Sequence, residues 1–173
     1  MQHRNDCLSA YLERVLALLN DQSELVRMRT IEAIRGVSEE GRDILVKKDK
    51  LHIYIHLVAS KLQESNHHLK NGSDCLRNLF DAMKEQNHKN HKIDYQSIGM
   101  ELLSIIPKIE IEEFLNSVTL CLMSLIDVFR EEEFLRRCVD VCIDAFESTM
   151  AEKPPNFRMS QTALLTVVHV SPP

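Results

Sequence analysis

The stretch 25–62, LVRMRTIEAIRGVSEEGRDILVKKDKLHIYIHLVASKL, decides the fold of this chain. Its first part has an apolar stripe at helical spacing that includes Val26, Ile34 and Val37, and Ser23 stands where an N-cap is expected. Further apolar residues fall on other sides of the same helix, a pattern typical of an inner helix with more than one neighbour. We therefore expect a helix from Ser23 to about Val37.

The second part of this stretch contains an ambiguous segment, LHIYIHLVA at 51–59, whose alternation could also be that of a strand. Leu51, Ile55 and Val58 keep helical spacing over a longer window, and no partner strand appears elsewhere in the chain. We expect a helix over about 49–63. Between the two parts, Gly36, Ser38 and Gly41 predict a break, followed by a short helix over about 39–47.

Outside this stretch the same helical periodicity recurs along most of the chain. It predicts further helices over about 8–19, 68–86, 95–106, 111–130 and 131–150, and the start of the helix at 68 could be delayed by Gly72. The segment NHKNHK at 87–92 has no apolar residue and is expected to be a loop.

Composition supports an all-α class. The 173 residues include only four glycines and five prolines, which is too few for a sandwich or barrel with many short strands. We expect one helical domain over 1–153. A Pro-Pro break and an incomplete terminal helix, apolar from Ala163 to Val170, are expected within 154–173.

From Val26 to Phe80 the chain resembles the armadillo/HEAT repeat superfamily, and with the opening helix the resemblance covers residues 8–83. The segments that carry it are GRDILVKK and LHIYIHLVASKL, which resemble the first and second helices of a repeat, and SDCLRNLFDAM, which resembles the next third helix. The resemblance implies a right-handed α-solenoid of helix pairs and triplets. The alternative is an irregular helical bundle.

In armadillo proteins the third helices line a concave groove that grips extended peptides. The resemblance therefore implies Arg35, Arg77 and Asn78 as protein-binding residues. The chain contains no tryptophan, and Asp74 stands where nuclear-import adaptors similar to this family have one. Binding of nuclear-import signals is accordingly not implied.

Charge and cysteine content limit the binding partners and the cellular compartment that we expect for this chain. The net charge of −5 repels phosphate backbones and anionic membranes, and the charge-free segment 114–126 is shorter than the roughly 20 residues of a membrane span. The five cysteines form no C-x-x-C pair, which favours a reducing, intracellular compartment, cytoplasmic or nuclear. No secretory signal is expected at the N-terminus, because it lacks an uninterrupted apolar core.

No motif of an enzyme or of a cofactor site is present, so we expect a noncatalytic protein with no cofactor, no metal and no small-molecule substrate. His52 and His56, at i and i+4, have a spacing that can bind a metal, but ordinary hydrogen-bonded histidines are favoured. Cys138 and Cys142 have the same spacing and are expected to be small buried apolar residues.

The leading functional hypothesis is a protein-interaction module or scaffold that binds a peptide or a helix of a partner protein. One alternative is an adaptor that contacts nucleic acid through Arg27, Arg29 and Arg35 together with the 84–92 segment, which would make its affinity strongly salt-dependent. A second alternative is a structural subunit whose apolar end at 163–170 packs into a larger assembly.

Overall fold

The computed structural model describes residues 11, 14–48 and 50–151. All regular elements in these residues are helical, which confirms the all-α class. The chain divides into two compact units, residues 1–94 and 95–173, and each is described by itself. The Pro-Pro break and the apolar segment 163–170 lie outside the described residues.

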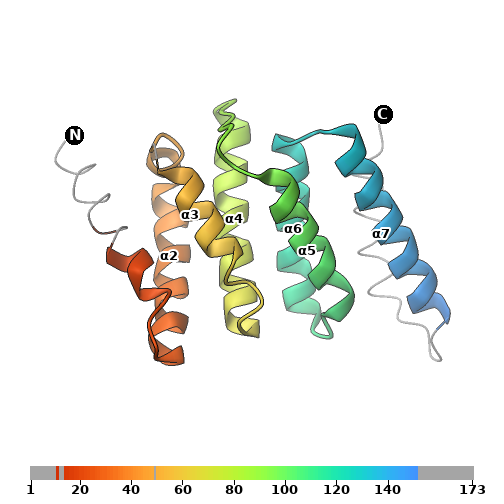
Figure 1. Ribbon diagram of the computed structural model, residues 1–173, viewed down its shortest axis with the longest axis horizontal. Helices are drawn as coiled ribbons and strands as arrows, with labels where there is room; N and C mark the ends of the chain where they lie inside the picture. Colours follow the sequence, from red (N-terminus) through yellow and green to blue (C-terminus); the bar gives the residue numbers. More distant parts are fainter. Residues whose placement is uncertain (1–10, 12–13, 49, 152–173) are drawn as a thin grey trace. The chain divides into compact units, whose positions relative to one another are not determined.

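The first unit is built on three helices, α2 (Glu24–Leu45), α3 (Leu51–Ala59) and α4 (Asn66–Glu85). Ion pairs join Arg27 to Glu64 near the start of α2 and α4, at 2.9 Å, and Arg42 to Glu85 near their ends, at 3.0 Å. The two long helices therefore run parallel and side by side, and α3 crosses in front of them (Figure 1). A further helical segment covers residues 14–18.

Apolar side chains from all three helices fill the core of this unit. Each helix contributes residues that are fully or almost fully buried: Ile31 and Ile34 from α2, Ile55 and Val58 from α3, and Leu76, Leu79 and Phe80 from α4. The helical prediction for 51–59 is confirmed, because the buried residues of α3 recur every three or four positions.

The predicted break at Gly36, Ser38 and Gly41 is wrong, because α2 continues through all three residues to Leu45. Ser38 donates its hydroxyl proton to the carbonyl oxygen of Arg35 at 2.7 Å, a bond that a helix accommodates. Each glycine weakens a helix by only about 1 kcal/mol. Burial of Ile34 and Leu45 on the same helix outweighs that cost.

The helix α4 begins at Asn66, earlier than the predicted start at 68, and Gly72 does not delay it. Ser65 is the N-cap, and its hydroxyl oxygen accepts a hydrogen bond from the backbone N–H of His68 at 3.3 Å. A Cβ atom on Gly72 would lie 2.7 Å from a methyl group of Leu62. Glycine is therefore present at 72 because of close packing, and it does not mark a helix boundary.

At its other end α4 stops in a left-handed turn. Asn87 has a φ of 49°, and the N–H of His88 donates to the carbonyl oxygen of Met83 at 2.8 Å. This is the Schellman arrangement, in which Asn substitutes for the usual glycine. The predicted loop over 87–92 is confirmed.

The second unit contains α5 (Tyr95–Ile105), the short 3₁₀ helix η1 (Ile106–Lys108), α6 (Glu112–Val128) and α7 (Glu132–Ala151). Pro107 lies within η1, and the predicted helices at 95–106, 111–130 and 131–150 are confirmed to within one or two residues. The apolar segment 114–126 is part of α6, where most of its side chains are buried.

An aromatic cluster joins the helices of this unit. Tyr95 stacks on Phe129 with ring centroids 5.3 Å apart, and Phe129 lies 5.7 Å from the ring of Phe134. The backbone of α5 approaches this cluster closely at Gly99, where any Cβ atom would overlap the Phe134 ring. The two helices α5 and α7 can pack at this distance only because residue 99 has no side chain.

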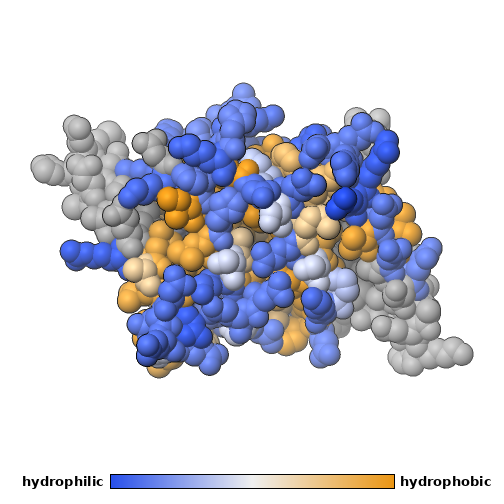
Figure 2. Space-filling model, viewed as in Figure 1, coloured by the Kyte–Doolittle hydropathy of each residue, from blue (hydrophilic) through white to orange (hydrophobic). Residues whose placement is uncertain are grey.

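Polar atoms cover most of the visible surface over the described residues of the first unit, but apolar atoms gather over α3 (Figure 2). On this helix the side chain of Ile53 is 51% exposed. Within the described residues, no helix is both long enough and apolar enough for a bilayer span.

Candidate functional site

Of the three predicted binding residues, Arg35 lies near the middle of α2, and Arg77 and Asn78 lie near the middle of α4. A hydrogen bond places Asn78 on the seam where these two helices meet. Asn78 donates its amide proton to the hydroxyl oxygen of Ser38 at 3.3 Å, and Ser38 in turn donates to the carbonyl oxygen of Arg35 at 2.7 Å. Asn78 is therefore partly used in holding the two helices together. Arg77 is the next residue on α4, and no contact joins its guanidinium to that of Arg35.

Behind Ser38, a buried polar chain extends the seam to α3. The hydroxyl of Tyr54 lies 3.4 Å from the carbonyl oxygen of Ile34 and 3.4 Å from the Sγ atom of Cys75. Burial raises the pKa of the Cys75 thiol to about 11, although hydrogen bonds from Tyr54 and Ser38 oppose this effect. The thiol is protonated at neutral pH, so Cys75 has a structural role.

Arg35 differs from the other arginines of α2. Arg27 and Arg42 pair with Glu64 and Glu85, and Arg29 donates to Glu32 at 2.9 Å. Arg35 is half-buried, and its Nε atom is buried without any hydrogen-bond partner among the described residues. Burying a charged group without partners is unfavourable, so the interactions of Arg35 are incomplete.

Arg77 has only a weak partner. One of its terminal nitrogens lies 3.9 Å from a carboxylate oxygen of Asp74, which is longer than a hydrogen bond. About a third of the Arg77 side chain is exposed, against 14% for Asp74. The guanidinium of Arg77 is therefore held loosely and remains accessible to a binding partner.

Sequence reasoning missed a second set of polar residues near the start of α4. The carboxylate of Glu64 accepts hydrogen bonds from Lys61 at 2.7 Å and from Arg27 at 2.9 Å. The Nε2 atom of His68 lies 3.6 Å from the same carboxylate, and its Nδ1 atom lies 2.9 Å from the hydroxyl of Ser65. The only sequence signal for this set is Ser65, a residue type that is favoured directly before a helix.

The pKa values of both titratable groups in this set are lowered, but for different reasons. Burial lowers the pKa of His68, although the neighbouring Glu64 carboxylate opposes this. Burial would raise the pKa of Glu64, but hydrogen bonds from Lys61 and Arg27 outweigh it and lower that pKa. Near neutral pH the stable arrangement is a neutral imidazole beside an ionised carboxylate.

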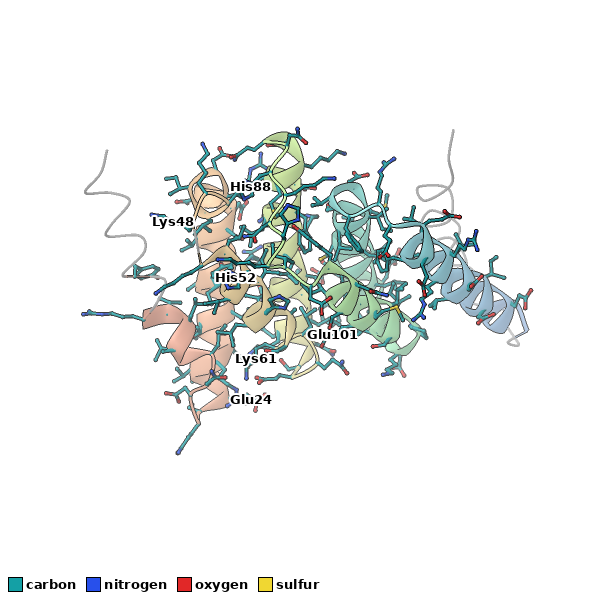
Figure 3. All side chains as sticks on the ribbon, turned by 45° about the horizontal axis from the view of Figure 1, so that its top comes forward. Glu24, Lys48, His52, Lys61, His88 and Glu101 are labelled. Carbon is teal, nitrogen blue, oxygen red and sulfur yellow. The ribbon has the colours of Figure 1, made fainter. Side chains whose placement is uncertain are left out.

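His56, one of the two histidines at i and i+4 on α3, is hydrogen-bonded as expected. The Nε2 atom of His56 accepts a hydrogen bond from the backbone N–H of Asp94 at 3.2 Å, which occupies its lone pair. His52 lies on α3, whereas His88 follows the C-terminal end of α4 (Figure 3). The described residues contain no group of three or more potential metal ligands.

The arginines of the nucleic-acid alternative do not form a common free surface. The Nη1 atom of Arg27 donates to the carbonyl oxygens of Asp21 and Gln22, in addition to the ion pair with Glu64. Arg29 is paired with Glu32, and among the described residues the Nε atom of Arg35 has no hydrogen-bond partner. Cys138 is buried, as expected, and the side chain of Cys142 lies outside the described residues.

Comparisons with known proteins give no family for this chain. It matches no protein-family model, and neither a curated protein nor a solved structure is similar to it at a significant level. The helices of the described residues define the fold class, which is all-α. Its function has to be argued from the α2–α4 seam.

Proposed function

We propose that this chain is a noncatalytic protein-interaction module that binds a peptide or a helix of a partner protein along α2 and α4. Arg35 carries the proposal, because it is a half-buried arginine whose Nε atom has no hydrogen-bond partner among the described residues. A partner whose binding turns this side chain toward its own acceptors would recover the free energy lost by burying the group.

The arrangement of the first unit supports an armadillo/HEAT-like architecture. Such a solenoid needs parallel inner helices connected by a crossing helix, and α2, α3 and α4 have this order and direction. Arg35, Arg77 and Asn78 lie on the inner helices of that proposed repeat. A surface built in this way binds extended or helical segments without chemistry of its own.

Two observations favour a noncatalytic role over an enzymatic one. The thiol of Cys75 is fully buried, and its raised pKa of about 11 makes it a poor nucleophile. The imidazole of His68 is also buried, and its interactions are with Ser65 and Glu64 of its own helix start.

The test is affinity capture from a nuclease-treated lysate with the full chain, at low and moderate salt, followed by mass spectrometry. The double variant Arg35→Gln/Arg77→Gln removes two positive charges from the seam and leaves the Asn78–Ser38 bond in place. Arg14→Gln/Lys47→Gln removes the same charge from exposed positions elsewhere in the unit.

We expect proteins that the wild type and the control variant retain at both salt concentrations and that the seam variant loses. Equal recovery by all three proteins would contradict binding along α2 and α4. Recovery that disappears with nuclease treatment or moderate salt would instead support the nucleic-acid alternative.

A further inference from the structure

In the second unit, the apolar arc of α7 extends beyond the side of the helix that packs on α5. Phe134 and Cys138 are fully buried, and the ring of Phe134 lies against the backbone of α5. About 100° further round the helix, Leu135 and Val139 are only half-buried. Ile143, one turn beyond Val139, is 43% exposed.

Leu135, Val139 and Ile143 follow one another at intervals of four residues, so they form one stripe along α7, which we call the outer stripe. Together with the core side, it makes about half of the helix circumference apolar, more than a single neighbouring helix covers. Figure 2 shows apolar atoms on the surface of this unit over part of α7. The rest of the circumference carries exposed charged residues: Arg136, Arg137, Asp140, Asp144 and Glu147.

The sequence that follows α7 contains an apolar segment of matching character. Residues 152–162, EKPPNFRMSQT, are mostly polar, whereas six of the eight residues of ALLTVVHV at 163–170 are apolar. Within this segment Leu164 and Val168 are four positions apart, and Thr166 falls on the opposite side of a helical pattern. The segment lies outside the described residues, so only its sequence enters the argument.

The linker between α7 and this segment has a suitable length. It consists of the eleven residues 152–162, and a flexible linker of that length has a root-mean-square span of about 18 Å. Along the axis of α7, Ile143 precedes the last residue, Ala151, by about 12 Å, and Leu135 precedes it by about 24 Å. The tether therefore reaches the outer stripe and gives the segment an effective concentration on the order of millimolar, with which a separate molecule would have to compete.

We propose that the segment 163–170 packs on the outer stripe of α7 in the same chain. This packing removes the apolar surfaces of both elements from water. The inference is independent of the proposed binding along α2 and α4, because it concerns other residues in the other unit. It differs from the structural-subunit alternative, in which the same segment packs on another molecule.

The test is photo-crosslinking of the full chain with p-benzoylphenylalanine in place of Ile143. Equal amounts of ¹⁴N-labelled and ¹⁵N-labelled chains are mixed before irradiation, and the linked peptides are identified by mass spectrometry. We expect position 143 to be linked to the peptide that contains 163–170, with the same isotope in both halves.

Asp144 is the control position for the probe. It is exposed, it has almost the same separation from the segment along the chain, and it lies about 100° further round the helix. We expect the probe at 144 to give at most about a tenth of the yield obtained from 143, because a packed segment is fixed on one side of α7.

Two variants of the segment identify the side that packs. Leu164→Asp should lower the crosslink yield from 143 by about tenfold, because it places a carboxylate where an apolar side chain is expected to be buried. Thr166→Asp adds the same charge two residues away and should keep the yield. Both changes lie outside the helices of the described residues, and circular dichroism checks that the helix content is unchanged.

Equal yields from 143 and 144 would overturn the inference, because they would show that the tether brings the segment near α7 without packing. Linked peptides that combine the two isotopes would overturn it in favour of packing on a second copy of the chain. The absence of any link between 143 and the segment 163–170 would overturn it as well.

Discussion

Glu64 and His68 fix the start of α4 against the start of α2, and both are sensitive to pH. Glu64 is held by Lys61 and Arg27, and the buried imidazole of His68 lies between this carboxylate and Ser65. Because Ser65 accepts the backbone N–H of His68, its own proton is available for Nδ1 of the neutral ring. Protonation of that ring would reverse the direction of this bond and place a third positive charge, on a buried group, beside one carboxylate.

We predict that acidification destabilises this region through His68. Its pKa is lowered in the folded chain from an ordinary value of 6.5, so its contribution to stability is complete above about pH 6.5 and is lost as the pH falls below that value. Substitution His68→Leu should therefore flatten the dependence of the melting temperature on pH between about 7 and 5. Thermal unfolding followed by circular dichroism over this range provides the measurement.

The matched control is His91→Gln, which replaces an exposed histidine in the 87–92 loop. This control variant should keep the pH dependence of the wild type. A pH dependence in His68→Leu as steep as that of the wild type would show that the acid sensitivity comes from other groups. Glu64 acts in a lower range, because its pKa is lowered from 4.5 and its contribution is lost as the pH falls below that value.

At the scale of the helices, replacing Gly99 or Gly36 by alanine is expected to change the stability of the chain in opposite directions. An added methyl group at Gly99 would overlap the ring of Phe134, whereas one at Gly36 would meet no atom within 4 Å. Gly99→Ala should destabilise the chain by about 1–3 kcal/mol despite the higher helix propensity of alanine. Gly36→Ala should stabilise it by about 0.5–1 kcal/mol, because it only reduces the entropy of the unfolded chain.

Urea denaturation of the two variants and the wild type, followed by circular dichroism, checks both values. A second variant tests the cause of the effect at Gly99. Replacing Phe134 by Leu in the Gly99→Ala background should recover part of the lost stability, since it removes the ring that the methyl group meets. Equal effects of Gly36→Ala and Gly99→Ala would contradict the close approach of α5 and α7.

The end of α4 gives a third prediction, at Asn87. A left-handed φ costs an ordinary L-residue about 1–2 kcal/mol, and glycine adopts it without that cost. Asn87→Ala should therefore lower the free energy of unfolding by about 1 kcal/mol, and Asn87→Gly should leave it equal or slightly higher. The same urea experiment measures both, and greater stability of the alanine variant would rule out the left-handed turn.

The helices themselves could be predicted from the sequence because apolar periodicity reports which side of each segment is buried. The predicted helix break failed at Gly36, Ser38 and Gly41. Burial of Ile34 and Leu45 outweighs the local preference of these residues for a break, so α2 continues. At the start of α4, Gly72 does not end the helix, because the close contact with Leu62 requires a residue without a side chain. A close approach between helices leaves no periodic pattern in a sequence.

For the molecule as a whole, the sequence and the structure agree on the all-α class, and the hydrogen bond to Ser38 places Asn78 between α2 and α4. The roles of Arg35, Arg77 and Asn78 in binding stay predictions. The state of these side chains could not be predicted, because it depends on partners that are distant in sequence. Ser38 engages Asn78 from 40 positions away, and Glu64 engages Arg27 from 37 positions away. Only the folded chain shows that Arg35 is left with unused donors.

The proposed binding surface for a partner protein runs along α2 and α4. Because Glu39 and Asp81 lie one turn beyond Arg35 and Arg77 on the same helix sides, a benzophenone side chain at either position would face that partner. Ile53, which is 51% exposed on α3, is the control position for the surface over α3.

The most direct measurement is photo-crosslinking of the full chain in living cells at each of these three positions, with the products identified by mass spectrometry. We predict that the probes at 39 and 81 give a covalent adduct with the same protein and that the probe at 53 does not. An adduct formed equally well from 53, or formed from 53 alone, would contradict the assignment of the binding surface to α2 and α4.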